Sequence, residues 1–109
     1  MTYYEGDWQK GLFYGYGFWR ARTGETYEGY YKYGIRHGYG EYTTTDGHRY
    51  TGDMLYGWPE GNGEILLENG YHWAGKFKDG SSVGVGTITA PDKTKFEGKM
   101  EEVGAVRIR

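Results

Sequence analysis

The side chains that could perform catalysis or bind a metal are three histidines and the acidic residues, and their spacing suits neither role. His37, His48 and His72 do not form a metal-binding pattern such as His-Glu-x-x-His. The chain contains no cysteine, which excludes a disulfide framework and a thiolate metal site. We therefore assign the histidines structural or surface roles and predict no catalytic residue, no metal site and no cofactor.

The acidic residues recur at a fixed interval instead of forming a pair. Glu5, Glu28 and Glu97 fall in one series, and Asp7 and Asp53 fall in another. A recurring carboxylate is typical of a solvated strand residue, or of a partner for a neighbouring basic side chain. General acid–base catalysis needs a carboxylate within hydrogen-bond reach of the proton it transfers, and a periodic series does not indicate that. The sequence thus predicts a protein that is not an enzyme.

A period of 23 residues organises the chain. In each copy an aromatic residue is followed two positions later by glycine and two further on by a large apolar residue. The aromatic series contains Tyr4, Tyr27, Tyr50, Trp73 and Phe96, and the glycine series contains Gly6, Gly29, Gly52, Gly75 and Gly98. Every glycine except Gly104 falls into one of five such series. A fixed period of this size indicates a repeat array.

Each copy has the pattern of a β-hairpin. Side chains alternate over 27–31 and again over 38–42, as in two strands. The Gly34 series between them marks a turn that needs positive φ, and Asp46-Gly47 marks the return to the next copy. We therefore predict an all-β fold: an elongated, single-sheet antiparallel β-meander of stacked 23-residue hairpins. Nine or ten strands spaced about 4.8 Å apart would make it about 43–48 Å long.

A sheet without helices must build its core from its own side chains, and glycine in a strand lets a neighbouring ring lie on the backbone. Twist and curvature would make the apolar face a shallow concave groove. The predicted apolar stripe consists of Tyr4, Trp8, Trp19, Tyr27, Tyr31, Tyr42, Tyr50, Met54, Ile65, Trp73, Phe77, Ile88, Phe96 and Met100.

The arrangement Tyr-Glu-Gly-x-Trp/Tyr-x-x-Gly-x-x-x-Gly-x-Gly, repeated every 23 residues, resembles the MORN (membrane occupation and recognition nexus) repeat. Residues 27–47 match best and 4–24 follow, whereas the third copy has Trp58-Pro59-Glu60 where the family has basic and histidine residues. The fourth copy departs at Trp73-Ala74 and Asp92-Lys93. The resemblance implies a rod of hairpins with no catalytic activity, which serves as a scaffold by gripping a peptide or helix, by self-association, or in some members by contacting anionic lipids.

We interpret residues 1–109 as a single array with repeats beginning at 4, 27, 50 and 73 and a partial one at 96. A stand-alone array, a designed protein and a module of a larger chain all fit this pattern. The final segment, 105–109, alternates apolar residues with arginine, as in a strand edge that resists pairing with other molecules.

Two aromatic surfaces are candidates for binding a partner. We predict a concave groove lined by Trp8, Trp19, Tyr31, Tyr42 and Trp73. A second set, Tyr16, Phe18, Tyr30 and Tyr39, should face the opposite side, where the third and fourth copies are mainly polar. Exposed tyrosines are enriched at interfaces, although tyrosine is also simply a good strand former.

Charge and hydropathy narrow the classes of partner. The net charge of −2 argues against nucleic-acid binding, and the basic residues are scattered among 15 acidic ones, which gives weak support to lipid binding. No apolar run is long enough to span a membrane, so we expect a cytoplasmic protein, or one peripheral to a membrane or the cytoskeleton. Our first hypothesis is a scaffold that binds a protein or peptide partner, or a second copy as a homodimer. The alternatives are a tether to anionic phospholipids and a purely structural or designed array without a ligand.

Overall fold

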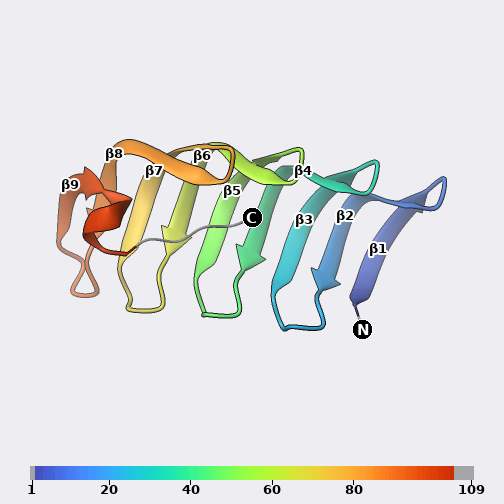
Figure 1. Ribbon diagram of the computed structural model, residues 1–109, viewed down its shortest axis with the longest axis horizontal. Helices are drawn as coiled ribbons and strands as arrows, with labels where there is room; N and C mark the ends of the chain where they lie inside the picture. The colour runs from blue at the N-terminus through green and yellow to red at the C-terminus, as the bar shows by residue number, and fades with distance from the viewer. Residues whose placement is uncertain (1, 105–109) are drawn as a thin grey trace.

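Each 23-residue unit folds into a β-hairpin, and the hairpins join into one sheet. The computed structural model describes residues 2–104. Its strands are β1 (Tyr3–Gln9), β2 (Leu12–Arg20), β3 (Thr26–Lys32), β4 (Ile35–Thr43), β5 (Arg49–Leu55), β6 (Trp58–Leu66), β7 (His72–Lys78), β8 (Ser81–Thr89) and β9 (Lys95–Lys99). The nine strands form a single antiparallel sheet in sequence order, and its longest dimension is 46 Å (Figure 1). The predicted all-β meander is confirmed.

Two-residue turns close the four hairpins. Both turn residues have positive φ, as in a type I′ turn, whose twist matches that of the flanking strands. The turns are Lys10-Gly11, Tyr33-Gly34, Tyr56-Gly57 and Asp79-Gly80, with φ of 50–53° at the first residue and 80–89° at the glycine. The requirement for positive φ at the glycine was predicted from the sequence. The left-handed residue before it was not, since Lys10, Tyr33 and Tyr56 stand where Asn or Asp is usual.

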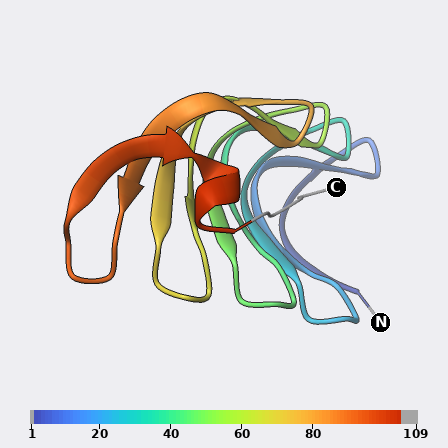
Figure 2. The ribbon, with the colours of Figure 1, turned by 60° about the vertical axis from the view of Figure 1, so that its left-hand side comes forward.

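An irregularity in pairing bends every hairpin. In the second hairpin Gly29 pairs with Gly40 but Tyr31 pairs with Arg36, so β4 contains two extra residues. Gly38, in this stretch, has a φ of 91°. Such a bulge bends the strand and increases its local twist. Repetition of the bulge curves the whole sheet along its strands, which gives it one concave and one convex face (Figure 2).

Aromatic rings on the concave face cover pairs of glycines that face each other across neighbouring strands. The Tyr50 ring lies over Gly52 and Gly63, and an added Cβ on Gly63 would be 2.5 Å from Tyr50 Cε1. Tyr50 Oη donates a hydrogen bond of 2.6 Å to the Asp53 carbonyl, so its polar end is satisfied. Tyr27 and Trp73 lie over equivalent glycine pairs. The buried core consists of Tyr27, Tyr31, Tyr42, Tyr50, Met54, Ile65, Leu67, Trp73, Phe77, Ile88 and Met100.

Two members of the predicted apolar stripe are exposed. Trp8 is 59% exposed because Tyr4 and Phe13 cover only part of it, whereas Tyr31, in the same series, also packs against rings of the preceding repeat. Phe96 is 44% exposed because β9 is followed by no paired strand in residues 2–104 that could complete its site. The prediction also omitted Leu67, which is buried.

A short 3₁₀ helix, η1 (Met100–Glu102), follows β9 and lies inside the curve of the sheet (Figures 1 and 2). Met100 is buried against the core, and Val103 packs beside it. The Glu102 carboxylate accepts a hydrogen bond of 2.8 Å from the Lys99 N–H, and Asn69 Nδ2 donates one of 3.2 Å to the Val103 carbonyl. The chain thus covers the concave face at its own C-terminal end. The strand-like segment predicted at 105–109 lies outside the described residues.

Replacement of a ring-covered glycine should be far more damaging than replacement of an open one. We expect Gly63→Ala to lower the free energy of unfolding by about 3 kcal/mol or more, the upper end for overpacking, because the methyl group displaces the Tyr50 ring from the core. The control is Gly24→Ala, where nothing lies within 4 Å and only a φ of +107° opposes alanine, at a cost of about 1–2 kcal/mol. Urea unfolding measures both values. Equal losses would contradict this account of the core.

Candidate functional site

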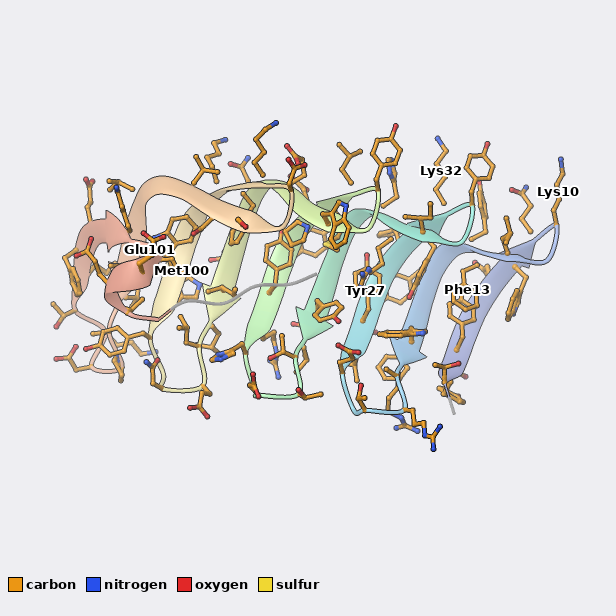
Figure 3. All side chains as sticks on the ribbon, in the orientation of Figure 1. Lys10, Phe13, Tyr27, Lys32, Met100 and Glu101 are labelled. Atoms are coloured by element: carbon orange, nitrogen blue, oxygen red, sulfur yellow. The ribbon has the colours of Figure 1, made fainter. Side chains whose placement is uncertain are left out.

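A hollow of about 420 Å³ opens on the concave face over the first two hairpins. Its lining comes from strands β2, β3 and β4, from the loop before β3, and from two turns, one before β4 and one after β5. The lining residues are Phe13, Trp19, Glu25, Tyr31, Gly34, Ile35, Arg36, Tyr42 and Gly57. Tyr31 and Tyr42 are buried and form its floor, while Phe13 and Trp19 are half-buried and Ile35 is exposed. Figure 3 shows Phe13 and Tyr27 on this face, whereas Lys10 and Lys32 project from the hairpin ends.

Two charged side chains line the hollow, and Tyr42 lies between them. Tyr42 Oη donates a hydrogen bond of 2.6 Å to Glu25 Oε2. The Arg36 guanidinium carbon lies 4.8 Å from the centre of the Tyr42 ring and 5.7 Å from that of Tyr27, in cation–π contact. Burial and the hydrogen bond to Glu25 raise the pKa of Tyr42 above its usual value, and Arg36 opposes this shift. Tyr42 therefore remains a neutral donor at physiological pH.

The structure brings together three of the five residues predicted to line a groove. Trp19, Tyr31 and Tyr42 share the hollow. Trp8 is not part of its lining and lies beside it against Phe13, with ring centres 5.0 Å apart. Trp73 is fully buried, so it offers no surface to a partner, and the prediction that it lines the groove is wrong. The ring of Trp73 fills the space over its glycine pair, and its Nε1 donates to a carbonyl of β9.

Sequence reasoning did not identify Phe13, Ile35, Arg36 or Glu25 as groove residues. Phe13 and Arg36 occupy equivalent positions two residues after the turn glycine, opposite the large apolar residue of the first strand. Pairing across the two-residue turn places this position on the same face as Tyr31. A correct prediction of the turn length and of the pairing register would therefore have placed Phe13 and Arg36 on the concave face.

The second predicted set lies on the convex face. Tyr16 and Tyr30 are directly paired across β2 and β3, and their rings pack edge to face with centres 5.5 Å apart. Tyr16 Oη donates a hydrogen bond of 2.5 Å to Glu28. Tyr39, like the other two, is at least half exposed, whereas Phe18 is half-buried beside Tyr3. This surface is aromatic and acidic, and its hollow beside Tyr16 and Tyr39 is about 230 Å³.

A depression of about 440 Å³ on the convex face is lined mainly by glycines and polar side chains. It crosses β4 to β7 and is lined by Tyr39, Thr51, Gly52, Asp53, Asn62, Gly63, Glu64, Ala74 and Gly75. Its one aromatic side chain is that of Tyr39. Binding sites are typically apolar concavities with a few placed polar groups. The hollow on the concave face fits this description better, because four aromatic side chains line it, those of Phe13, Trp19, Tyr31 and Tyr42.

The histidines and acidic residues form local contacts. His72 Nε2 lies 3.1 Å from Glu64 Oε1, and His48 Nδ1 accepts a hydrogen bond of 3.1 Å from the Glu68 N–H. Residues 2–104 contain no group of three or more His, Cys, Asp or Glu side chains that could hold a metal ion. Over the same residues, no helix has the length and apolar character needed to cross a membrane.

Comparison with protein families identifies the repeat. The family model of the MORN repeat matches residues 4–26, 27–49, 50–70 and 73–95, which cover most of the chain. The matches begin at the four positions where the 23-residue register places the full repeats. Comparison with curated proteins gave no match.

The buried tyrosines should make the protein sensitive to alkali. Burial raises the pKa of Tyr27 from 10.0 to about 12 and that of Tyr31 and Tyr50 further. Because the folded state holds these hydroxyls protonated, their contribution to stability is complete below pH 10 and is lost as the pH rises through about 12. We expect the Tm to fall steeply over this interval, in step with tyrosinate absorbance.

Two variants separate this effect from general alkaline damage. Tyr27→Phe removes one buried hydroxyl, and should make the fall in Tm with pH shallower. Tyr56→Phe changes an exposed turn tyrosine and should leave it unchanged. A Tm that stays constant from pH 10 to 12 would show that the tyrosines do not hold the fold in their neutral form.

Proposed function

The chain belongs to the MORN repeat family, and we propose that it is a non-enzymatic scaffold module that holds a segment of another protein on its concave face. MORN repeats suggest a repeat scaffold or binding module. The more specific proposal rests on the open aromatic hollow over the first two hairpins.

The position of this hollow supports a role in binding. At the C-terminal end, η1 and Val103 already cover the concave face, and the core beneath them is buried. Over the first two hairpins no equivalent segment in residues 2–104 covers Phe13, Trp19 and Ile35. Within residues 2–104 the concave face is therefore covered by the chain itself at the C-terminal end and uncovered over the first two hairpins.

The lining of the hollow suits tight recognition. Phe13 is stacked on Tyr4, with ring centres 3.7 Å apart, and packs edge to face on Tyr31 at 5.3 Å. Side chains fixed in this way lose little conformational entropy when a partner arrives. Aromatic residues in packed pockets commonly supply most of the energy of an interface. The hollow could accept one large apolar side chain of an extended or helical segment, with the rest of that segment lying along the curved face.

The test is selection from a library of displayed random peptides, followed by affinity measurements on variants. We expect selected peptides to bind in the micromolar range and to perturb the NMR signals of Trp19. Ile35→Lys introduces a charge at an exposed wall of the hollow and should weaken binding at least about tenfold by leaving that charge unpaired in the interface.

Two matched variants decide between the faces. Val85→Lys places the same charge on an exposed strand position outside the hollow and should leave binding unchanged. Tyr30→Ala should affect binding only if the convex tyrosines make the contact. Binding that survives Ile35→Lys and is lost in Tyr30→Ala would transfer the proposal to the convex face. Failure to select any peptide, together with a dimer in light scattering, would favour a second copy as the partner.

A further inference from the structure

Two hollows on the convex face join into one trough. The hollow of about 230 Å³ beside Tyr16 and the depression of about 440 Å³ over β4 to β7 share Tyr39 and Thr51 in their linings. Together they cross the sheet from β2 to β7, and strands spaced about 4.8 Å apart make this convex trough about 24 Å long. An extended segment of about seven residues has that length.

The charged side chains that line the convex trough are all acidic. They are Glu28, Glu41, Asp53 and Glu64, and no lysine, arginine or histidine is among the lining residues. Within residues 2–104, only Glu64 of these four has a basic partner at ion-pair distance, His72. At the β7 end, Lys76 Nζ donates a hydrogen bond of 2.6 Å to the side-chain oxygen of Asn62. The trough therefore carries unpaired negative charge over β3 to β5.

Two of these carboxylates face each other directly across β3 and β4. Glu28 is paired with Glu41, and like charges placed opposite each other destabilise a sheet. The equivalent pairs in the other three hairpins are Glu5 with Phe18, Thr51 with Glu64, and Ala74 with Thr87. At most one position of the pair is acidic in those hairpins, so the repeat pattern does not account for the double charge.

Exposed tyrosine rings border the opposed glutamates. Tyr16 and Tyr39 line the convex trough, and Tyr30 packs edge to face on Tyr16. Elsewhere the chain itself places a cation over an exposed tyrosine, as Lys32 does with its Nζ 5.7 Å from the ring centre of Tyr33. No cation of residues 2–104 lies over the three convex rings. Carboxylates and ring faces that both attract cations therefore lie side by side without one.

The local field around these rings is negative. Tyr16 Oη donates its hydrogen bond to Glu28, and this bond raises the pKa of Tyr16. The charges of Glu28 and Glu41 raise it further. A cation placed between the two carboxylates would meet attraction from both and would relieve their mutual repulsion.

We propose that the convex trough binds an extended basic segment of a second protein, with an arginine or lysine side chain between Glu28 and Glu41. The aliphatic stem of that side chain would lie along the rings of Tyr16 and Tyr39, with its charged end at the carboxylates. This goes beyond the proposed function, because the trough is on the face opposite to the aromatic hollow. A chain that binds one segment on each face would link two partners.

The first experiment compares two peptides with blocked ends, hexa-arginine and hexa-citrulline, whose side chains have the same shape but differ in charge. NMR titration at neutral pH and low salt follows the backbone amide signals of Glu28, Tyr39 and Glu41. We expect the arginine peptide to shift these signals and to bind at least about tenfold more tightly than the citrulline peptide. High salt should remove most of this preference, since it screens exposed charges. Equal affinities, or shifts confined to the concave face, would overturn the proposal.

A matched pair of variants assigns the preference to the opposed glutamates. Glu41→Gln should weaken binding of the arginine peptide at least about threefold. It should not lower the free energy of unfolding, because it removes a like-charge pair. Glu97→Gln makes the same change of charge at the position of β9 equivalent to Glu28, outside the trough, and should leave the affinity unchanged. Equal losses in the two variants would indicate diffuse attraction to the net charge and refute the proposal.

A second pair tests the tyrosine rings. Tyr39→Leu keeps an apolar side chain but removes the ring face, and should weaken binding of the arginine peptide about twofold to fivefold. Tyr56→Leu, at an exposed turn outside the trough, should leave it unchanged. An undiminished affinity in Tyr39→Leu would contradict the contact with the ring.

One further variant separates the two faces. Glu25→Gln removes the carboxylate of the concave hollow and should not affect the arginine peptide. A larger loss in Glu25→Gln than in Glu41→Gln would place the basic segment in that hollow and overturn the proposal. The proposed function depends instead on Ile35 and on selected peptides, so either proposal can fail while the other stands.

Discussion

The contact between an aromatic ring and two facing glycines is the interaction on which this structure depends. A single sheet in which residues 2–104 form no α-helix has no second layer to cover it, so it must bury apolar area with its own side chains. Tyr27, Tyr50 and Trp73 achieve this completely, since none of them is exposed. Each ring occupies the space that two Cβ atoms would otherwise fill. The high glycine content is therefore a packing requirement and not a sign of disorder.

The need to bury rings on a single sheet also accounts for the curvature of the sheet and for the difference between its two ends. The bulge near Gly38 bends the strands around the rings and makes their face concave. Each repeat completes the core of its neighbour, as when Tyr31 packs against Tyr4 and Phe13. Where described neighbours end, the core must be closed by other means. Met100 and η1 close it after β9, whereas no segment of the described part of the chain covers the concave face over the first two hairpins.

Stability and recognition consequently share residues. Tyr31 and Tyr42 are part of the core and also form the floor of the open hollow, which is therefore rigid before any partner binds. Its walls are the less buried Phe13, Trp19 and Ile35. Arg36 lies over the rings of Tyr42 and Tyr27, and Glu25 accepts a hydrogen bond from Tyr42, so both charged side chains of the hollow are held in place. Fixed aromatic walls over a rigid floor are the features from which we derive the proposed function.

The sequence alone determined the 23-residue repeat of hairpins, the turn glycines and the pairing of rings with glycines, because strand alternation and turn conformation depend on residues close in the chain. Tertiary structure decided which rings are exposed, because that depends on neighbouring repeats. Trp8 and Tyr31 share a position in the repeat, yet only Tyr31 is buried; Trp73, predicted to line a groove, is sealed in the core. The hollow likewise exists only where strands from successive hairpins meet.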